Sequence, residues 1–151
     1  EEFRKIIVAE DGTITIPAAA CRSPKNGEKV RFMESIDGGM QVHYGLQGQR
    51  PELLSYAVEL AEAGNYEFTA HVCTVTMDRQ FLLRVNRRTL VEVDIPYTKA
   101  DWMDTKPVEI ELKEGRNRIS YTHYAPNKGV SIKEFKLKPV KLKKAQSAAE
   151  R

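Results

Sequence analysis

The 151-residue sequence has no apolar run close to the roughly 20 residues that a membrane-spanning helix needs, so insertion into a bilayer is not expected. It has two cysteines, Cys21 and Cys73, which allow either one disulfide in an exported protein or two free thiols. One-sided charge is also lacking, since 24 basic and 21 acidic residues leave a net charge of +3. The basic excess lies largely at the C-terminal end, where the tail offers lysines without aromatic residues. Nucleic-acid binding is therefore not expected.

The motifs of common enzyme classes are missing as well. There is no Gly-x-Ser-x-Gly elbow, no phosphate-binding loop and no His-Glu-x-x-His. Asp101 and Asp104 flank the single tryptophan, but carboxylates three residues apart in a loop are better explained as turn caps than as an acid pair. We do not expect the chain to be an enzyme or to need a cofactor.

Two histidines and a cysteine could in principle hold a zinc ion or form a nucleophile. His71 and Cys73 share a strand face, where side chains two residues apart lie about 6 to 7 Å from each other, too far for direct proton transfer. Adding His123 would give three zinc ligands, but no Cys-x-x-Cys spacing supports a zinc site. We interpret these residues as ordinary members of a sheet.

Helical periodicity is almost absent, and a period of two replaces it. In the segment 66–75, Tyr66, Phe68, Ala70 and Val72 fall on one face. The segment 51–62 fits the alternating strand 54–60 better than a helix. Further strands are expected at 13–16, 29–33, 40–44, 81–85, 89–95, 108–112, 118–124 and 130–137.

Turn residues separate these strands at short intervals. Gly115 suits a position of positive φ in the hairpin loop 113–116. The apolar phase shifts between Ile132 and Phe135, which predicts a β-bulge in the last strand. Eight to ten short strands without helices predict an all-β sandwich or barrel. We expect one such domain over residues 1–140, followed by a basic linker or tail over 141–151.

Trp102 is the largest apolar side chain, yet it stands among Pro, Thr, Asp and Lys, where a turn is expected. Either the indole covers the open end of the core, or it is displayed for a flat ligand to stack on. Its neighbours alone leave both interpretations open.

Five segments in order resemble one family. They form a strand, an Ala-Gly-x-Tyr turn and a strand, then a hairpin, a Pro-Thr-Trp loop, a second hairpin and a closing strand. The segments are Ser55–Val72, Leu83-Arg-Val-Asn-Arg87, Ile95-Pro-Tyr-Thr-Lys-Ala-Asp-Trp102, Ile110-Glu-Leu-Lys-Glu-Gly-Arg-Asn117 and Gly129–Leu137. Together they resemble carbohydrate-binding modules of the family-six and family-thirty-five type, which are galactose-binding-like jelly rolls. The resemblance implies an all-β antiparallel sandwich with jelly-roll topology. The resemblance covers about residues 50 to 140 and is more specific for the fold than for the ligand.

The resemblance implies a sugar site at one end of the sandwich. Trp102 would stack on a pyranose, because a rigid aromatic side chain buries the C–H face of a sugar at low entropic cost. Tyr44 would be a second aromatic plate and Asn127 an amide that bonds hydroxyl groups. Asp101 and Tyr97, from the same loop as the tryptophan, complete the expected set.

The structural calcium of such modules is doubtful in this chain. The family's asparagine falls on Ser131 and its aspartate on Lys133, and a lysine cannot ligate calcium. Glu10, in Ala9-Glu-Asp11, resembles the acidic N-terminal element of that site but would lack its partner.

The sequence leaves two main hypotheses. The first is a non-catalytic module that binds a glycan or oligosaccharide and targets a larger secreted, periplasmic or surface protein to it. The chain begins Glu1-Glu-Phe3 without an initiator methionine, which fits a processed part of such a protein. The second is a structural or protein-interaction sandwich that binds no sugar. A small hydrolase would need acids converging on one cleft.

Overall fold

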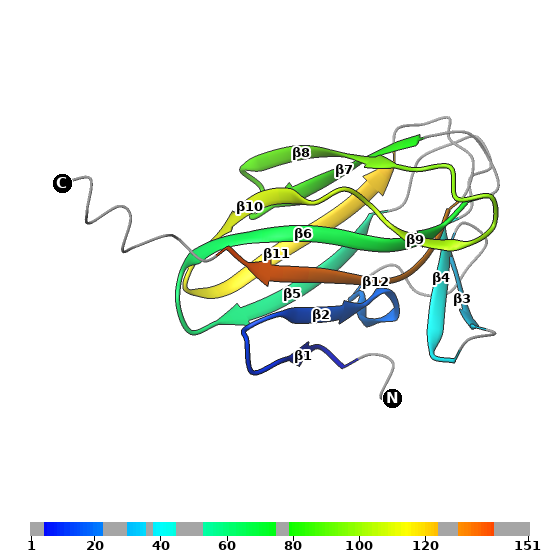
Figure 1. Ribbon diagram of the computed structural model, residues 1–151. Helices are drawn as coiled ribbons and strands as arrows, with labels where there is room; N and C mark the ends of the chain where they lie inside the picture. The colour runs from blue at the N-terminus through cyan, green and yellow to red at the C-terminus, as the bar shows by residue number, and fades with distance from the viewer. Residues whose placement is uncertain are drawn as a thin grey trace.

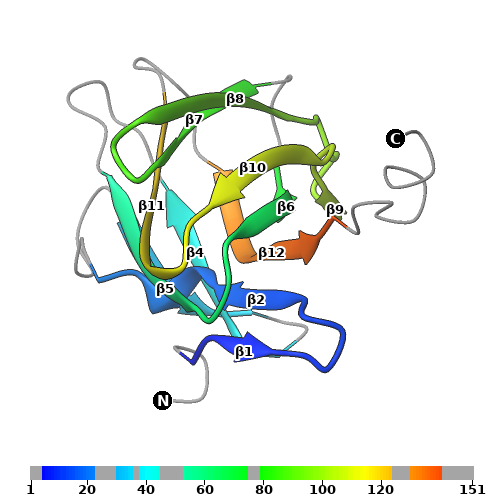
Figure 2. The ribbon, with the colours of Figure 1, turned by 90° about the vertical axis from the view of Figure 1, so that its left-hand side faces the viewer.

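The computed structural model describes residues 5–22, 30–35, 38–44, 53–74, 79–123 and 130–140, and in these ranges the chain is almost entirely β-structure. Two antiparallel sheets curl around a common interior (Figures 1 and 2). The larger sheet contains β1 (Ile7–Val8), β2 (Ile14–Pro17), β3 (Val30–Glu34), β4 (Met40–Tyr44), β6 (Gly64–Cys73), β9 (Trp102–Asp104), β10 (Val108–Leu112) and β12 (Val130–Pro139). The smaller sheet has the order β5 (Leu54–Leu60), β11 (Gly115–His123), β7 (Arg79–Val85) and β8 (Thr89–Ile95). The predicted all-β sandwich is confirmed.

Strand β12 organises the larger sheet, because it pairs with β2, β4 and β6. Strand β6 also pairs with β10 and β9. The register between β12 and β6 shifts between Ile132 and Glu134, so Lys133 is the extra residue of a bulge. This irregularity lies where the apolar phase shift predicted one.

Alternation along the strands builds the core. The predicted inward face of β6 is buried at Phe68, Ala70 and Val72, while Tyr66 is half-buried at its end. Aromatic rings from both sheets meet inside, with the ring centroids of Phe68 on β6 and Phe81 on β7 6.3 Å apart. A short 3-10 turn, η2 (Ala18–Ala20), is buried beside them. These contacts confirm that the alternating residues face a shared interior.

Tyr56 shows why the segment 54–60 is a strand and not a helix. Its ring is buried and lies edge-on to Phe135, with 5.2 Å between the centroids. Its hydroxyl donates a hydrogen bond of 2.7 Å to the carbonyl of Ala18, so the one polar atom of the side chain is satisfied. Burial raises the pKa of Tyr56 well above its usual value. The ring therefore serves as a core residue.

The remaining sequence predictions compare closely with the observed elements. Residues 40–44 form a strand with the predicted bounds, and the last strand runs two residues further, to Pro139. Gly115 has a φ of 88°, as the hairpin loop required. Cys21 and Cys73 are thiols and not a disulfide. The tail 141–151 lies outside the described residues, so the domain boundary at 140 stays a prediction.

Candidate functional site

Trp102 begins a short strand, and the prediction that it lies in a turn is wrong. Strand β9 pairs with the end of β6, so that Trp102 lies opposite Cys73 and Asp104 lies opposite His71. The local sequence is rich in turn residues, yet it is held in the sheet by side-chain hydrogen bonds on both sides of the strand.

Before the strand, Thr98 is bonded to Thr74. The Thr98 hydroxyl accepts a hydrogen bond from the Thr74 amide at 2.8 Å and donates one to the Thr74 carbonyl at 3.1 Å. The Thr74 hydroxyl accepts from the Thr98 amide at 2.9 Å and donates to the carbonyl of Pro96, also at 2.9 Å. Both threonines are buried. This reciprocal pairing fixes the loop that leads to Trp102.

After the strand, Thr105 makes a similar pair of hydrogen bonds, here with the backbone of Ala70. Its buried hydroxyl accepts from the amide of Ala70 at 2.9 Å, and its own amide donates to the Ala70 carbonyl at 2.9 Å. Between the two anchors, Lys99 and Ala100 have φ values of 53° and 68°, in the left-handed region that non-glycine residues rarely adopt. Strained backbone that the surrounding structure holds in place is common at functional sites.

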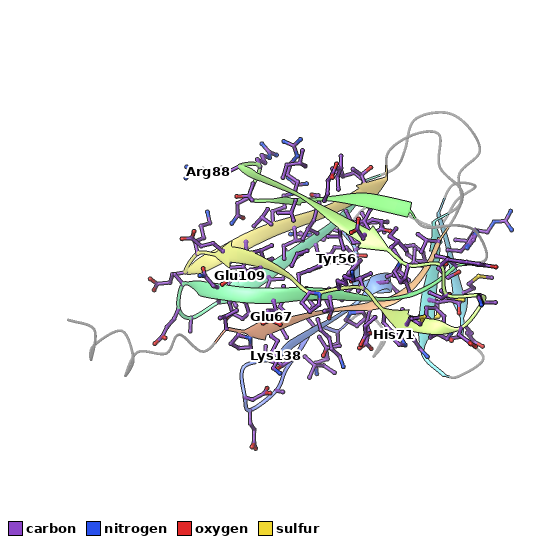
Figure 3. All side chains as sticks on the ribbon, turned by 45° about the horizontal axis from the view of Figure 1, so that its top comes forward. Tyr56, Glu67, His71, Arg88, Glu109 and Lys138 are labelled. Carbon is purple, nitrogen blue, oxygen red and sulfur yellow. The ribbon has the colours of Figure 1, made fainter. Side chains whose placement is uncertain are left out.

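The indole of Trp102 is half-buried and has two close neighbours. It stacks on the imidazole of His71, with 5.5 Å between ring centroids and 15° between planes. The ammonium of Lys133 lies 5.6 Å from the centroid of the indole, within the range of a cation–π contact. His71 Nδ1 lies 2.8 Å from an oxygen of the exposed Asp104, which orients the imidazole under the indole. Figure 3 places His71 on the outer surface near β9.

A row of outward-facing residues continues from this point across the sheet. Paired residues of neighbouring strands share a face, and the pairings run Trp102, Cys73, Ser131, His43, Arg31 over β9, β6, β12, β4 and β3. Four strand spacings give the row a length of roughly 19 Å. It carries one large aromatic ring and several hydrogen-bonding groups.

His43 and Ser131 form the polar centre of the row. His43 Nδ1 lies 3.1 Å from the hydroxyl of Ser131. Burial, and second the charge of Arg31, lower the pKa of His43, so the ring is neutral at physiological pH. Neutral imidazole and hydroxyl groups both donate and accept, as the hydroxyl groups of a sugar do.

The other predicted site residues are only partly placed. Tyr97 and Asp101 are exposed in the loop before β9, and Tyr97 has an exposed fraction of 40%. Tyr44 ends β4 opposite Val130, but its side chain lies outside the described residues, as do Asn127 and the side chain of His123. The grouping of Trp102, Tyr44 and Asn127 in one site therefore stays a prediction.

Glu10 is exposed in the turn between β1 and β2. The neighbouring Asp11 accepts a hydrogen bond of 2.9 Å from the amide of Thr13, and this bond lowers the pKa of Asp11. Within the described residues, no three His, Cys, Asp or Glu side chains are grouped as metal ligands.

In the same ranges, no helix is long and apolar enough to cross a membrane.

The sequence did not identify the residues that touch Trp102. Lys133 was noted only as a poor calcium ligand, and His71 only as a sheet residue. The predicted bulge could have indicated an unusual role for Lys133, because the extra residue of a bulge has its side chain redirected. For His71, the signal was its place two residues from Cys73 on the outward face.

No protein-family profile matches the chain, and no curated protein matches it in sequence. Solved structures do match its fold. The GH26-CBM35 β-(1,4)-mannanase of Podospora anserina superposes with a TM-score of 0.68 at 15% identity, over 89% of this chain and 29% of the mannanase. The C-terminal CBM6 of a Zobellia galactanivorans laminarinase gives 0.68 at 19% identity, over 83% of this chain and 98% of that module. A Clostridium stercorarium CBM6 in complex with cellobiose gives 0.64 at 16% identity, over 83% and 93% of the two chains.

These matches confirm the fold that the sequence motifs suggested. The chain is similar in extent to the isolated modules and spans less than a third of the mannanase.

Proposed function

We propose that this chain is a non-catalytic carbohydrate-binding module within a larger exported protein, and that Trp102 is the centre of its site. One observation carries the proposal: a half-buried indole, backed by His71, stands at the end of a polar row on an otherwise ordinary sheet. Its fold is that of modules such as the one solved with cellobiose, which supports the same function.

The chemistry of the site suits a sugar. A pyranose presents polarised C–H groups on one face and hydroxyl groups around its edge. An indole that is already held against an imidazole loses little further freedom when the C–H face stacks on it. Asp104, which is bonded to His71, can accept from the hydroxyl groups, and Lys133, whose ammonium lies over the indole, can donate to them, both through charge-assisted bonds. We include Tyr97, Asp101, Tyr44 and Asn127 as further candidates for the sugar site.

A structural or protein-interaction domain is the alternative function. It would leave Trp102 as a cover for the rim of the sandwich. The two functions differ in one measurable property, because a sugar that stacks on the indole changes its fluorescence, and Trp102 is the only tryptophan.

The test combines a glycan array with fluorescence titration of the bound sugars. We expect wild-type protein to bind at least one oligosaccharide and Trp102→Ala to lose about tenfold or more in affinity, while Trp102→Phe keeps part of it. Leu90→Ala, which removes an exposed aliphatic side chain from the smaller sheet, is the matched control and should bind like wild type. Far-UV circular dichroism checks that each variant is folded. No binding across a broad array, or unchanged binding by folded Trp102→Ala, would contradict the proposal.

A further inference from the structure

A second surface, on the outer side of the smaller sheet, has a different chemistry. A groove of about 530 Å³ lies beside β5 and β11. Five cationic residues line it, Arg22, Arg87, Lys113, Arg116 and Arg118, and the rest of the lining is neutral: Ser55, Tyr56, Ala57 and Asn86. All five cationic residues are exposed, and the lining contains no carboxylate. The groove therefore concentrates positive charge on a molecule whose net charge is only +3.

None of the five cations forms an ion pair within the part of the chain that the structure describes. Among the described residues, the ion pairs join His71 to Asp104 and Lys136 to Glu134, and none involves a residue of the groove. Glu59 lies opposite Arg116 in the ladder between β5 and β11 but does not line the groove. The guanidinium groups are thus available for an external anion.

The wall of the groove is rigidly built around Asn117, which is fully buried. Its side-chain oxygen accepts from the amide of Lys113 at 3.0 Å and from Asn86 Nδ2 at 2.8 Å. Asn86 in turn accepts from the amide of Arg118 at 2.8 Å. The network ties the turn 86–88 to the hairpin at Lys113, so the cations from both segments are held near each other before any ligand arrives.

The Arg118 side chain and the Arg22 backbone are restrained further. Arg118 Nε donates to the hydroxyl of Ser55 at 3.1 Å, and the amide of Arg22 donates to the carbonyl of Ser55 at 2.7 Å. These bonds anchor residues from distant parts of the sequence on one strand. A guanidinium group can donate two hydrogen bonds side by side to two oxygens of a carboxylate or of a sulfate group.

Arg87 occupies a position that favours glycine. Asn86 and Arg87 have φ values of 51° and 61°, and the amide of Arg88 donates to the carbonyl of Val85, as in a type I′ turn. An arginine in this conformation costs about 1 kcal/mol more than glycine would. A strained cation on the wall of a basic groove indicates a role for its side chain.

We propose that this groove binds an acidic polysaccharide, one that bears carboxylate or sulfate groups along its chain. Arg116 and Arg118 lie two residues apart on one strand, about 7 Å, and the other cations flank them, so the surface suits a row of anionic groups. Single-stranded nucleic acid would need exposed aromatic rings to stack on. The one aromatic residue in the lining, Tyr56, is 1% exposed, and its hydroxyl is bonded to Ala18.

The test compares neutral dextran with dextran sulfate, which shares its backbone and adds charge, and with polygalacturonate, which carries carboxylates on a different backbone. We expect the protein to bind dextran sulfate or polygalacturonate but not neutral dextran, in titrations at low and high salt. Affinity should fall steeply with salt, because the contacts are ionic. Whichever polymer binds more tightly identifies the preferred group, sulfate or carboxylate.

The informative variants are Arg87→Gly and the double variant Arg116→Gln/Arg118→Gln. Arg87→Gly removes a cation and relieves the strained backbone, so weaker binding cannot come from unfolding. We expect each variant to bind the acidic polymer about tenfold more weakly. Arg88→Gln is the matched control, because Arg88 is exposed on the same turn but does not line the groove (Figure 3).

Three results would overturn this inference: equal binding of dextran and dextran sulfate, equal weakening by Arg88→Gln, or tight binding of an oligonucleotide but of neither acidic polymer. The inference does not rest on Trp102. Trp102→Ala should keep its affinity for the acidic polymer, so failure at one surface leaves the other testable.

Discussion

The hydrogen bonds between Thr98 and Thr74 can be tested by the isosteric replacement Thr98→Val. Valine keeps the shape of the buried side chain but removes the hydroxyl. The Thr74 amide then loses its acceptor in a site that is 2% exposed, and the bond from the Thr98 hydroxyl to the Thr74 carbonyl disappears. A buried unsatisfied amide costs about 1 to 3 kcal/mol and a lost neutral hydrogen bond about 1 kcal/mol. The free energy of unfolding should therefore fall by roughly 2 to 4 kcal/mol.

Urea unfolding, followed by tryptophan fluorescence and by far-UV circular dichroism, measures this loss. Trp102 lies four residues from the substitution, so its emission should shift to longer wavelength at a lower urea concentration than in wild type. Thr69→Val is the matched control, because Thr69 is half-buried and faces outward on β6, the strand to which β9 is paired. A loss below about 0.5 kcal/mol in Thr98→Val, or an equal loss in the control, would refute the anchoring role.

Two further predictions concern backbone strain and pH. Ala100→Gly should raise the melting temperature by about 2 to 4 °C, because glycine adopts the φ of 68° without strain, whereas Ala57→Gly within strand β5 should lower it. A rise in the second variant, or a fall in the first, would contradict this account. Because the native pKa of His43 lies below the usual 6.5, the unfolded chain binds its proton first as the pH falls, so stability should rise with pH through the region below 6.5. In His43→Gln, the urea midpoint should rise less steeply with pH below 6.5 than in wild type. An equally steep rise in the variant would contradict the assignment to His43.

The sequence predicted the strands well because burial alternates along them. Successive side chains of a strand point to opposite faces, so apolar residues at every second position mark the buried face. This local pattern alone identifies Phe68, Ala70 and Val72 as core residues. The bulge at Lys133 was equally visible, since it interrupts that recurrence.

The surroundings of Trp102 could not be predicted in the same way. The loop before it resembles a turn because it is rich in turn residues, and only the bonds to Thr74, 24 positions earlier, make it lead into a strand. The contacts of the indole come from β6 and from the bulge in β12, which local patterns do not connect. The sequence therefore singled out the tryptophan by its unusual setting but did not reveal its partners.

The basic groove was missed for a related reason. Its cations come from three segments, around residues 22, 87 and 113–118, and none of these is a run of positive charge. The lysine excess that the sequence does show lies elsewhere, at the C-terminal end. Only the pairing of β5 with β11 and the turn at Asn86 bring these cations together.

The central position of β12 has a consequence for how the protein is made. Strands β2, β4 and β6 all precede β12 by at least 57 residues, yet each depends on it as a neighbour in the sheet. During synthesis on the ribosome, the edge of each earlier strand that pairs with β12 remains unpaired until Val130 and the residues after it emerge. Such a chain folds late and slowly, since its decisive contacts join distant positions. A nascent chain arrested before Val130 should therefore depend on chaperones to escape aggregation.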